Sequence, residues 1–201
     1  MKKFTMFVFA ALMTLLSVTA GAQSTLRIRG TIAGLDGNVL SVTSRDGKTL
    51  KIHLADNFTV SAAKAVALAD IKPGDFVGPA SRMGADGKLV AISLQLFPAA
   101  LRGVVPEGHG PWDLEPGSMM TNATVATMVQ ASGGDELTLQ YKGGSQKILV
   151  PDGVPIFTTV PGDRSLLVPG AYVFTTARSG ADGTLSSARV AVSKDGVRPA
   201  N

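Results

Sequence analysis

Residues 101–125 read LRGVVPEGHGPWDLEPGSMMTNATV, and this stretch is unlike the sequence on either side of it. Its distinctive side chains are the only Trp, one of the two His and three acids: Trp112, His109, Glu107, Asp113 and Glu115. Both flanking segments are rich in β-branched residues and glycine turns, and they resemble each other. We therefore interpret residues 101–121 as an ordered, proline- and glycine-rich linker between two copies of one β-rich unit.

The segment before the linker, residues 23–100, has the pattern of a small barrel. It opens with three alternating apolar and polar runs, separated by Asp-Gly turns, which is typical of hairpins. Residues 61–70, SAAKAVALAD, have the composition and apolar spacing of a short helix with a Ser N-cap. Two further strands follow, on either side of the turn at 84–87. Three strands, a helix and two strands is the order of an OB-type barrel, and the helix favours this barrel over a β-sandwich of similar alternation.

The segment after the linker, residues 122–194, repeats the first at a shift of about 96 positions. Gly-Ala-Asp-Gly occurs at 84–87 and again at 180–183, and Ile52 falls on Ile148. Turn residues and buried register are what a duplicated fold must keep. The sequence thus predicts an all-β protein of two tandem OB-like five-stranded barrels related by internal duplication.

The second copy carries Pro and Gly where the first copy carries alanines, so its helix is reduced to a single turn at 163–166. The polar residues 195–201 are expected to form a flexible tail.

The first 22 residues have the pattern of a secretory signal peptide. Lys2 and Lys3 precede an apolar run, and Ala20-Gly21-Ala22 is a small-residue cleavage site. The run is too short for a membrane span, and no later stretch is apolar enough for one. We expect cleavage after Ala22 and a periplasmic mature protein with no membrane span.

Charge and cysteine content limit the classes of function. The chain has 19 Lys+Arg and 15 Asp+Glu, and two of the lysines lie in the signal peptide. The remaining excess is too small and too dispersed to indicate a nucleic-acid partner. Because the chain has no Cys, it forms no disulfides and must hold its fold by burial.

The linker also holds the candidate metal ligands, His109, Glu107 and Asp113. One imidazole with carboxylates suits Zn²⁺ or Mn²⁺, and carboxylates alone suit Ca²⁺, although the spacing matches no specific metal motif. A divalent metal is the one cofactor that these residues suggest. Four methionines suggest Cu(I) as a further alternative, although Met more often fills gaps between domains: Met83, Met119, Met120 and Met128.

Trp112, with Arg102 and Glu107, is the candidate ligand-binding set. We expect the linker to dock in the groove between the two barrels, with Trp112 as its anchor and the indole N–H donating to a carbonyl. The alternative is that the Trp112 ring stacks on a ligand. In the docked arrangement we expect Arg102 to pair with Glu107 or Asp113. His53 lies on the polar phase of its strand and is expected to face solvent.

Catalytic residues are not indicated. The sequence has no Cys, no G-x-S-x-G motif and only two His to act as a base. We therefore expect no enzyme, with a hydrolase based on the central carboxylates as the third alternative.

The linker motifs resemble those of a group of small exported proteobacterial proteins of unknown function. The shared pattern is RG…EGH.PWD…MTNATV, found here from Arg102 to Val125, and these proteins carry β-barrel repeats around it. Members of the group are often labelled metal transporter permeases. The resemblance implies, at most, a soluble companion of metal transport.

From these observations we expect a non-catalytic periplasmic binding or interaction module whose partner is a ligand or another envelope protein. A soluble metal-binding accessory protein is the alternative. The sequence indicates neither the ligand nor the oligomeric state.

Overall fold

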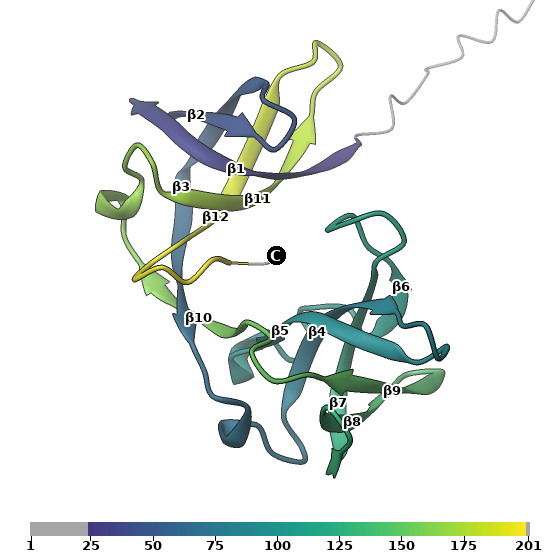
Figure 1. The fold of residues 1–201 in the computed structure, drawn as a ribbon. Helices are drawn as coiled ribbons and strands as arrows, with labels where there is room; N and C mark the ends of the chain where they lie inside the picture. The colour runs from purple at the N-terminus through teal and green to yellow at the C-terminus, as the bar shows by residue number, and fades with distance from the viewer. Residues whose placement is uncertain (1–23, 200–201) are drawn as a thin grey trace, which may run out of the picture.

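The computed structural model describes residues 24–199, and this part of the chain is all-β (Figure 1). The strands are β1 (Thr25–Asp36), β2 (Val39–Ser44), β3 (Thr49–Ala65), β4 (Phe76–Met83), β5 (Leu89–Leu96), β6 (Gly108–Pro111), β7 (Met119–Ala131), β8 (Gly134–Tyr141), β9 (Gly144–Val150), β10 (Ile156–Gly162), β11 (Tyr172–Ser179) and β12 (Leu185–Val192). The 3-10 turns are η1 (Leu68–Asp70), η2 (Ala99–Leu101) and η3 (Arg164–Leu166). No helix within residues 24–199 is long and apolar enough to cross a membrane. The predicted signal peptide lies outside the described residues.

Five strands close a first ring. β1 pairs with β2, β2 with β3, β3 in parallel with β12, β12 with β11, and β11 with β1. The inward-facing apolar residues of these strands form one core, which includes Ile28, Leu40, Ile52, Val173 and Val190. The alternation seen in the sequence therefore does fill a barrel interior.

Five other strands close a second ring. β4 pairs with β5, β5 in parallel with β9, β9 with β8, β8 with β7, and β7 with β4. Its separate core includes Val77, Leu94, Val125, Leu139 and Ile148. In Figure 1 the two rings lie one above the other, and β3 runs from the first ring toward the second.

The division of strands between the rings differs from the sequence-based prediction of one barrel over residues 23–100 and another over 122–194. The first ring combines β1–β3 with β11 and β12, and the second combines β7–β9 with β4 and β5. Each ring thus takes three strands from one half of the chain and two from the other. Because the chain crosses between the rings on leaving β3 and again on leaving β10, neither ring is a contiguous domain.

The predicted helix over 61–70 is also wrong. β3 continues as a strand to Ala65, and only η1 follows. Between Val60 and Ala65 this strand pairs with β10, and its Val60–Ala62 part also pairs with β12. Ladder pairing therefore overrides the weak helix preference of a segment too short to be stable as an isolated helix. The single turn predicted at 163–166 is confirmed as η3, whose N-cap Asp163 accepts from Ser165 N.

The two rings share their pairing register. Leu89 faces Ile148 between β5 and β9, and Leu185 faces Ile52 between β12 and β3, so each partner is displaced by the 96 positions of the sequence repeat. This equivalence is consistent with internal duplication, which stays a prediction.

The tail predicted as flexible is packed in its described part. Lys194 and Val197 bridge each other, the Arg198 guanidinium lies 4.9 Å from the Tyr172 ring centroid, and Pro199 is buried. Residues 195–199 thus contribute to the surface of the first ring.

Candidate functional site

The central segment divides into a strand and a loop. β6 pairs with the start of β7, with His109 opposite Thr121. Residues 112–118, the Trp112 loop, are then closed by Trp112 N donating to Ser118 O at 2.7 Å. The Ser118 hydroxyl lies 3.0 Å from Trp112 O and 2.8 Å from Glu115 O, so the loop is held by its own polar groups.

The Trp112 loop docks on the outer face of the first ring. Arg29 Nη1 donates to Asp113 Oδ1 at 2.9 Å. Arg45 donates to Asp113 O at 2.7 Å and to Leu114 O at 2.5 Å. These contacts join residues 68 to 84 positions apart and confirm that the linker is docked rather than free.

Aromatic rings cover the Arg29 guanidinium. Its centre lies 5.2 Å from the Trp112 ring and 4.8 Å from the Phe174 ring, while Arg27 lies 4.3 Å from Trp112. Burial lowers the pKa of Arg29, and the neighbouring Asp113 carboxylate acts in the opposite direction. A buried cation needs such a counter-charge, so Asp113 stabilises the Arg29 guanidinium that the Trp112 ring contacts.

The predicted ligand-binding set is not brought together. Trp112 lies against Arg27 and Arg29. Arg102 instead donates to Gly74 O at 2.6 Å and to Thr124 Oγ1 at 2.9 Å, and Glu107 Oε2 accepts from Lys142 N at 3.2 Å. The expected pairing of Arg102 with Glu107 or Asp113 is therefore wrong.

The anchoring interpretation of Trp112 also needs one correction. Its Nε1 is buried and has no hydrogen-bond partner among residues 24–199, so the expected bond to a carbonyl is not formed. The indole is held by its ring faces and the two arginines.

The predicted metal set is likewise not assembled. Asp113 faces Arg29 on the first ring, whereas His109 lies on β6 beside the second. Across residues 24–199, no three His, Cys, Asp or Glu side chains are grouped so as to hold a metal ion. His53 is exposed, as its strand phase predicts.

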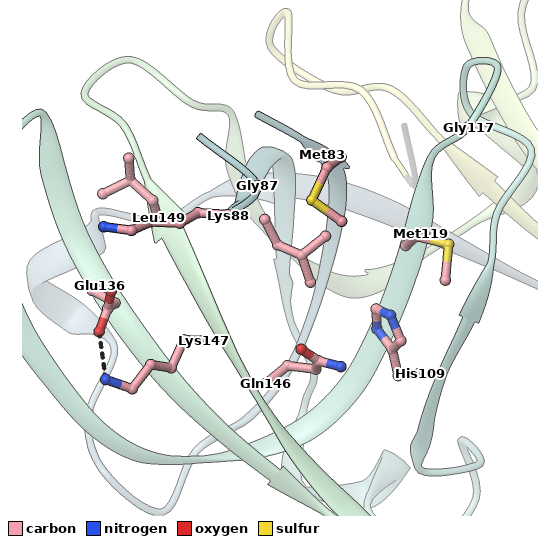
Figure 2. A pocket seen from close by; sticks show the side chains of 11 residues that line it. Met83, Gly87, Lys88, His109, Gly117, Met119, Glu136, Gln146, Lys147 and Leu149 are labelled. Atoms are coloured by element: carbon pink, nitrogen blue, oxygen red, sulfur yellow. Dashed lines mark ion pairs between the residues drawn. The ribbon is translucent and has the colours of Figure 1, made fainter. Parts of the chain in front are cut away.

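A cleft of about 630 Å³ opens on the second ring, and we call it the mouth cleft (Figure 2). It is lined by the β4–β5 hairpin, by β8 and β9, and by the central segment. Its residues are Met83, Gly87, Lys88, Leu89, His109, Gly117, Met119, Glu136, Gln146, Lys147 and Leu149.

One part of the mouth cleft continues the barrel interior. Thr121, Ala123 and Val125 of β7 are buried, and alternation places Met119 on the same inward face but nearer the end of the strand. His109 pairs with Thr121, so it lies on that face as well. On β9, Gln146 shares the phase of the buried Ile148. These side chains therefore surround the open end of the second ring.

The other part of the mouth cleft is an outer rim. Lys147 and Leu149 alternate with buried Ile148 and Val150 and so face outward. Lys147 Nζ lies 3.1 Å from Glu136 Oε1, and Figure 2 shows this ion pair on the side of the cleft away from His109. The rim thus offers both charges next to the apolar Leu149.

His109 has a defined orientation. Its Nδ1 lies 2.8 Å from the hydroxyl of the fully buried Thr121. Burial lowers the pKa of His109, which favours the neutral ring at neutral pH. Within the described residues no hydrogen bond involves Nε2, the nitrogen that a neutral ring donating from Nδ1 would offer to a ligand.

Sequence reasoning found His109 but missed the rest of the mouth cleft. The available signal was Leu149, an apolar residue on the outward phase of a strand whose neighbours are buried. The closure of β5 on β9, which brings Lys88 and Leu89 to the cleft, depends on strand exchange and leaves no local signal.

No protein-family model, no curated protein and no solved structure matches this chain.

Proposed function

We propose that this protein is a non-catalytic, exported binding module that takes a small amphipathic ligand in the mouth cleft. The carrying observation is an open hollow of about 630 Å³ at a barrel end, a size and position typical of ligand sites. Its apolar residues are Met83, Leu89, Met119 and Leu149. Lys88, Glu136 and Lys147 place charges beside them, so a ligand with an apolar body and an anionic group fits best.

The position within the fold supports the same proposal. β8 and β9 are the second and third strands of their ring in order, and the β4–β5 hairpin joins its fourth and fifth. In OB-type barrels the face of the second and third strands and the loop after the fourth bind ligands. This support is analogy at the level of fold.

We propose that this binding takes place in the periplasm, because residues 1–22 have the pattern of a signal peptide. A partner protein of the envelope would then receive or supply the ligand. The docked Trp112 loop has a structural role in this proposal, because the Asp113 carboxylate and the Trp112 ring are already engaged with Arg27 and Arg29 of β1.

A titration with 8-anilinonaphthalene-1-sulfonate tests the proposal, because this probe combines apolar rings with a sulfonate. We expect saturable binding of one probe per protein. Leu149→Gln should weaken it about fivefold, since losing an apolar contact of this size corresponds to roughly 1 kcal/mol. Val168→Asn is the matched control, because Val168 is 51% exposed and lies outside the mouth cleft.

Both variants should keep the wild-type melting curve, which separates loss of the cleft from loss of the fold. Probe binding that does not saturate, or that Leu149→Gln and Val168→Asn weaken equally, would contradict the proposal.

A further inference from the structure

Two thioethers and one imidazole lie on the inward face of three adjacent strands at the open end of the second ring. Ser81 of β4 pairs with Met119 of β7, and Pro111 of β6 pairs with Met119 from the other edge. Met83 and His109 are each two positions from these partners, so alternation places both on the face of Met119. Met83, Met119 and His109 accordingly all line the mouth cleft (Figure 2).

The strand register puts His109 and Met119 within reach of each other. His109 is directly opposite Thr121, and Met119 is its diagonal neighbour on the same face. Diagonal cross-strand neighbours lie close enough for long side chains to meet. Figure 2 shows the Met119 side chain next to the His109 ring, with the Met83 sulfur on the other side of the cleft.

The geometry points to a binding site for a soft monovalent metal ion, Cu(I), with His109 Nε2 and Met119 Sδ as its ligands and Met83 Sδ as a third. Thioethers and imidazole are ligands that favour Cu(I) over harder divalent ions. The flexible side chain of Met83, which is 62% exposed, has the rotational freedom to close over an ion held by the other two.

The hydrogen bond of His109 suits this role. A metal-binding imidazole commonly donates from its second nitrogen to a fixed partner, which sets both the ring orientation and the tautomer. Thr121 is such a partner, because it is fully buried in the barrel wall and lies 2.8 Å from Nδ1.

The proposed ion differs from the divalent metal suggested by the linker acids. Those acids are dispersed, and Asp113 is committed to Arg29. The new site shares only His109 with that set. It lies in the same cleft as the proposed amphipathic ligand, but it does not require that ligand.

Methionine methyl NMR provides the test. The sequence from residue 24 onward contains four methionines, Met83, Met119, Met120 and Met128. The mature protein is titrated with Ag⁺, a soft monovalent probe with the same d¹⁰ configuration as Cu(I). We expect the methyl signals of Met83 and Met119 to shift and saturate at one equivalent. Those of Met120, on the opposite face of β7, and of Met128, packed against the second core, should stay in place.

Affinity for Cu(I), measured by competition with a chromophoric chelator under anaerobic reducing conditions, then ranks the ligands. Met119→Leu and His109→Gln should each weaken binding at least 30-fold, and Met83→Leu about three- to tenfold. Met120→Leu is the matched control and should change nothing. Zn²⁺ at the same concentration should not compete.

Equal effects of Met119→Leu and Met120→Leu, or equal shifts of all four methyl signals, would overturn the site. So would Zn²⁺ binding as tightly as Cu(I). Leu149→Gln, which weakens anilinonaphthalene sulfonate binding, removes none of the proposed metal ligands and should leave the affinity for Cu(I) within about twofold. Loss of metal binding and loss of ligand binding are therefore separable outcomes.

Discussion

The two rings share one pattern of strand pairing but differ in how the central segment packs against them. In the first ring, the outer face of β1 is covered by the Trp112 loop, which buries Arg29 beneath an indole. In the second ring, β6 extends the sheet beside β7 and forms one wall of an open cleft. The same central segment produces both results, because its strand belongs to one ring and its loop to the other.

The equivalent positions 149 and 53 show how this difference reaches single residues. Leu149 pairs with Val90, and His53 pairs with Ser186, at matching places in the two rings. Leu149 lines the mouth cleft, whereas His53 is an exposed polar residue. The outward strand position is therefore apolar in the ring that has the cleft and polar in the ring that does not.

The largest expected loss of stability comes from a substitution in β1, at a position where the two rings carry different residues. Gly30 pairs with Val173 as Ala123 pairs with Val77, so these are matching positions in the two rings. A Cβ at Gly30 would lie 2.1 Å from Thr43 O and 2.8 Å from Val42 Cγ1. Since the nearest atom is backbone, Gly30→Ala must displace β2, and we expect a loss of more than about 3 kcal/mol in unfolding free energy.

Urea denaturation measures this loss, and Ala123→Gly is the control. That change removes a methyl group that the second ring already accommodates, so it should lower stability by only about 1 kcal/mol. If Gly30→Ala unfolds at the same urea concentration as the wild type, the close approach of β1 and β2 does not require a glycine at this position.

The next largest loss of stability is expected from removing the Trp112 indole, which lies against the outer face of the first ring. Trp112→Ala deletes the ring that lies on Arg27 and Arg29, and we expect a loss of roughly 2–4 kcal/mol. Because each ring combines strands from both halves of the chain, unfolding should remain one cooperative transition. Limited proteolysis should now cleave within residues 112–118.

Val168→Ala, at an exposed site, is the control for this substitution. Unchanged stability together with protease resistance at residues 112–118 would mean that the arginines and Asp113 hold the loop without the indole.

The sequence predicted those features of the fold that depend on only a few neighbouring residues. The hairpin turns, the alternation of the first three strands and the single turn at 163–166 were all predicted and lie as expected. Each depends on alternation or on one side chain near its own backbone. Docking of Trp112 was also predictable, since leaving an indole in water is unfavourable.

The pairing of strands that are distant in the sequence could not be predicted. The two halves repeat the same strand pattern, so alternation alone does not decide whether β1 pairs with β4 or, as observed, with β11. The partner of Asp113 followed from that choice. Arg29 reaches it because β1 and β11 together form the docking face, whereas Arg102 is drawn to Gly74 O beside β4.

The smallest expected effect compares the second hairpin turns of the two rings under acid. The β2–β3 turn contains Asp46, whose pKa is held at about 2 by the Ser44 hydroxyl and by Lys48, below its usual 3.8. The corresponding β8–β9 turn, at Lys142 and Gly143, has no acid. Because the folded state binds fewer protons than the unfolded state between these pKa values, Asp46 contributes stability above pH 3.8, and this contribution is lost as the pH falls toward 2. We therefore expect the Gly47 amide, which donates to Ser44 O, to lose protection from hydrogen exchange on acidification more than the Gly144 amide does.

NMR titration of the Asp46 carboxyl carbon should show a midpoint near 2, which Ser44→Ala moves toward 3.8. A midpoint that Ser44→Ala leaves unchanged would show that Lys48, rather than the hydroxyl, holds this turn.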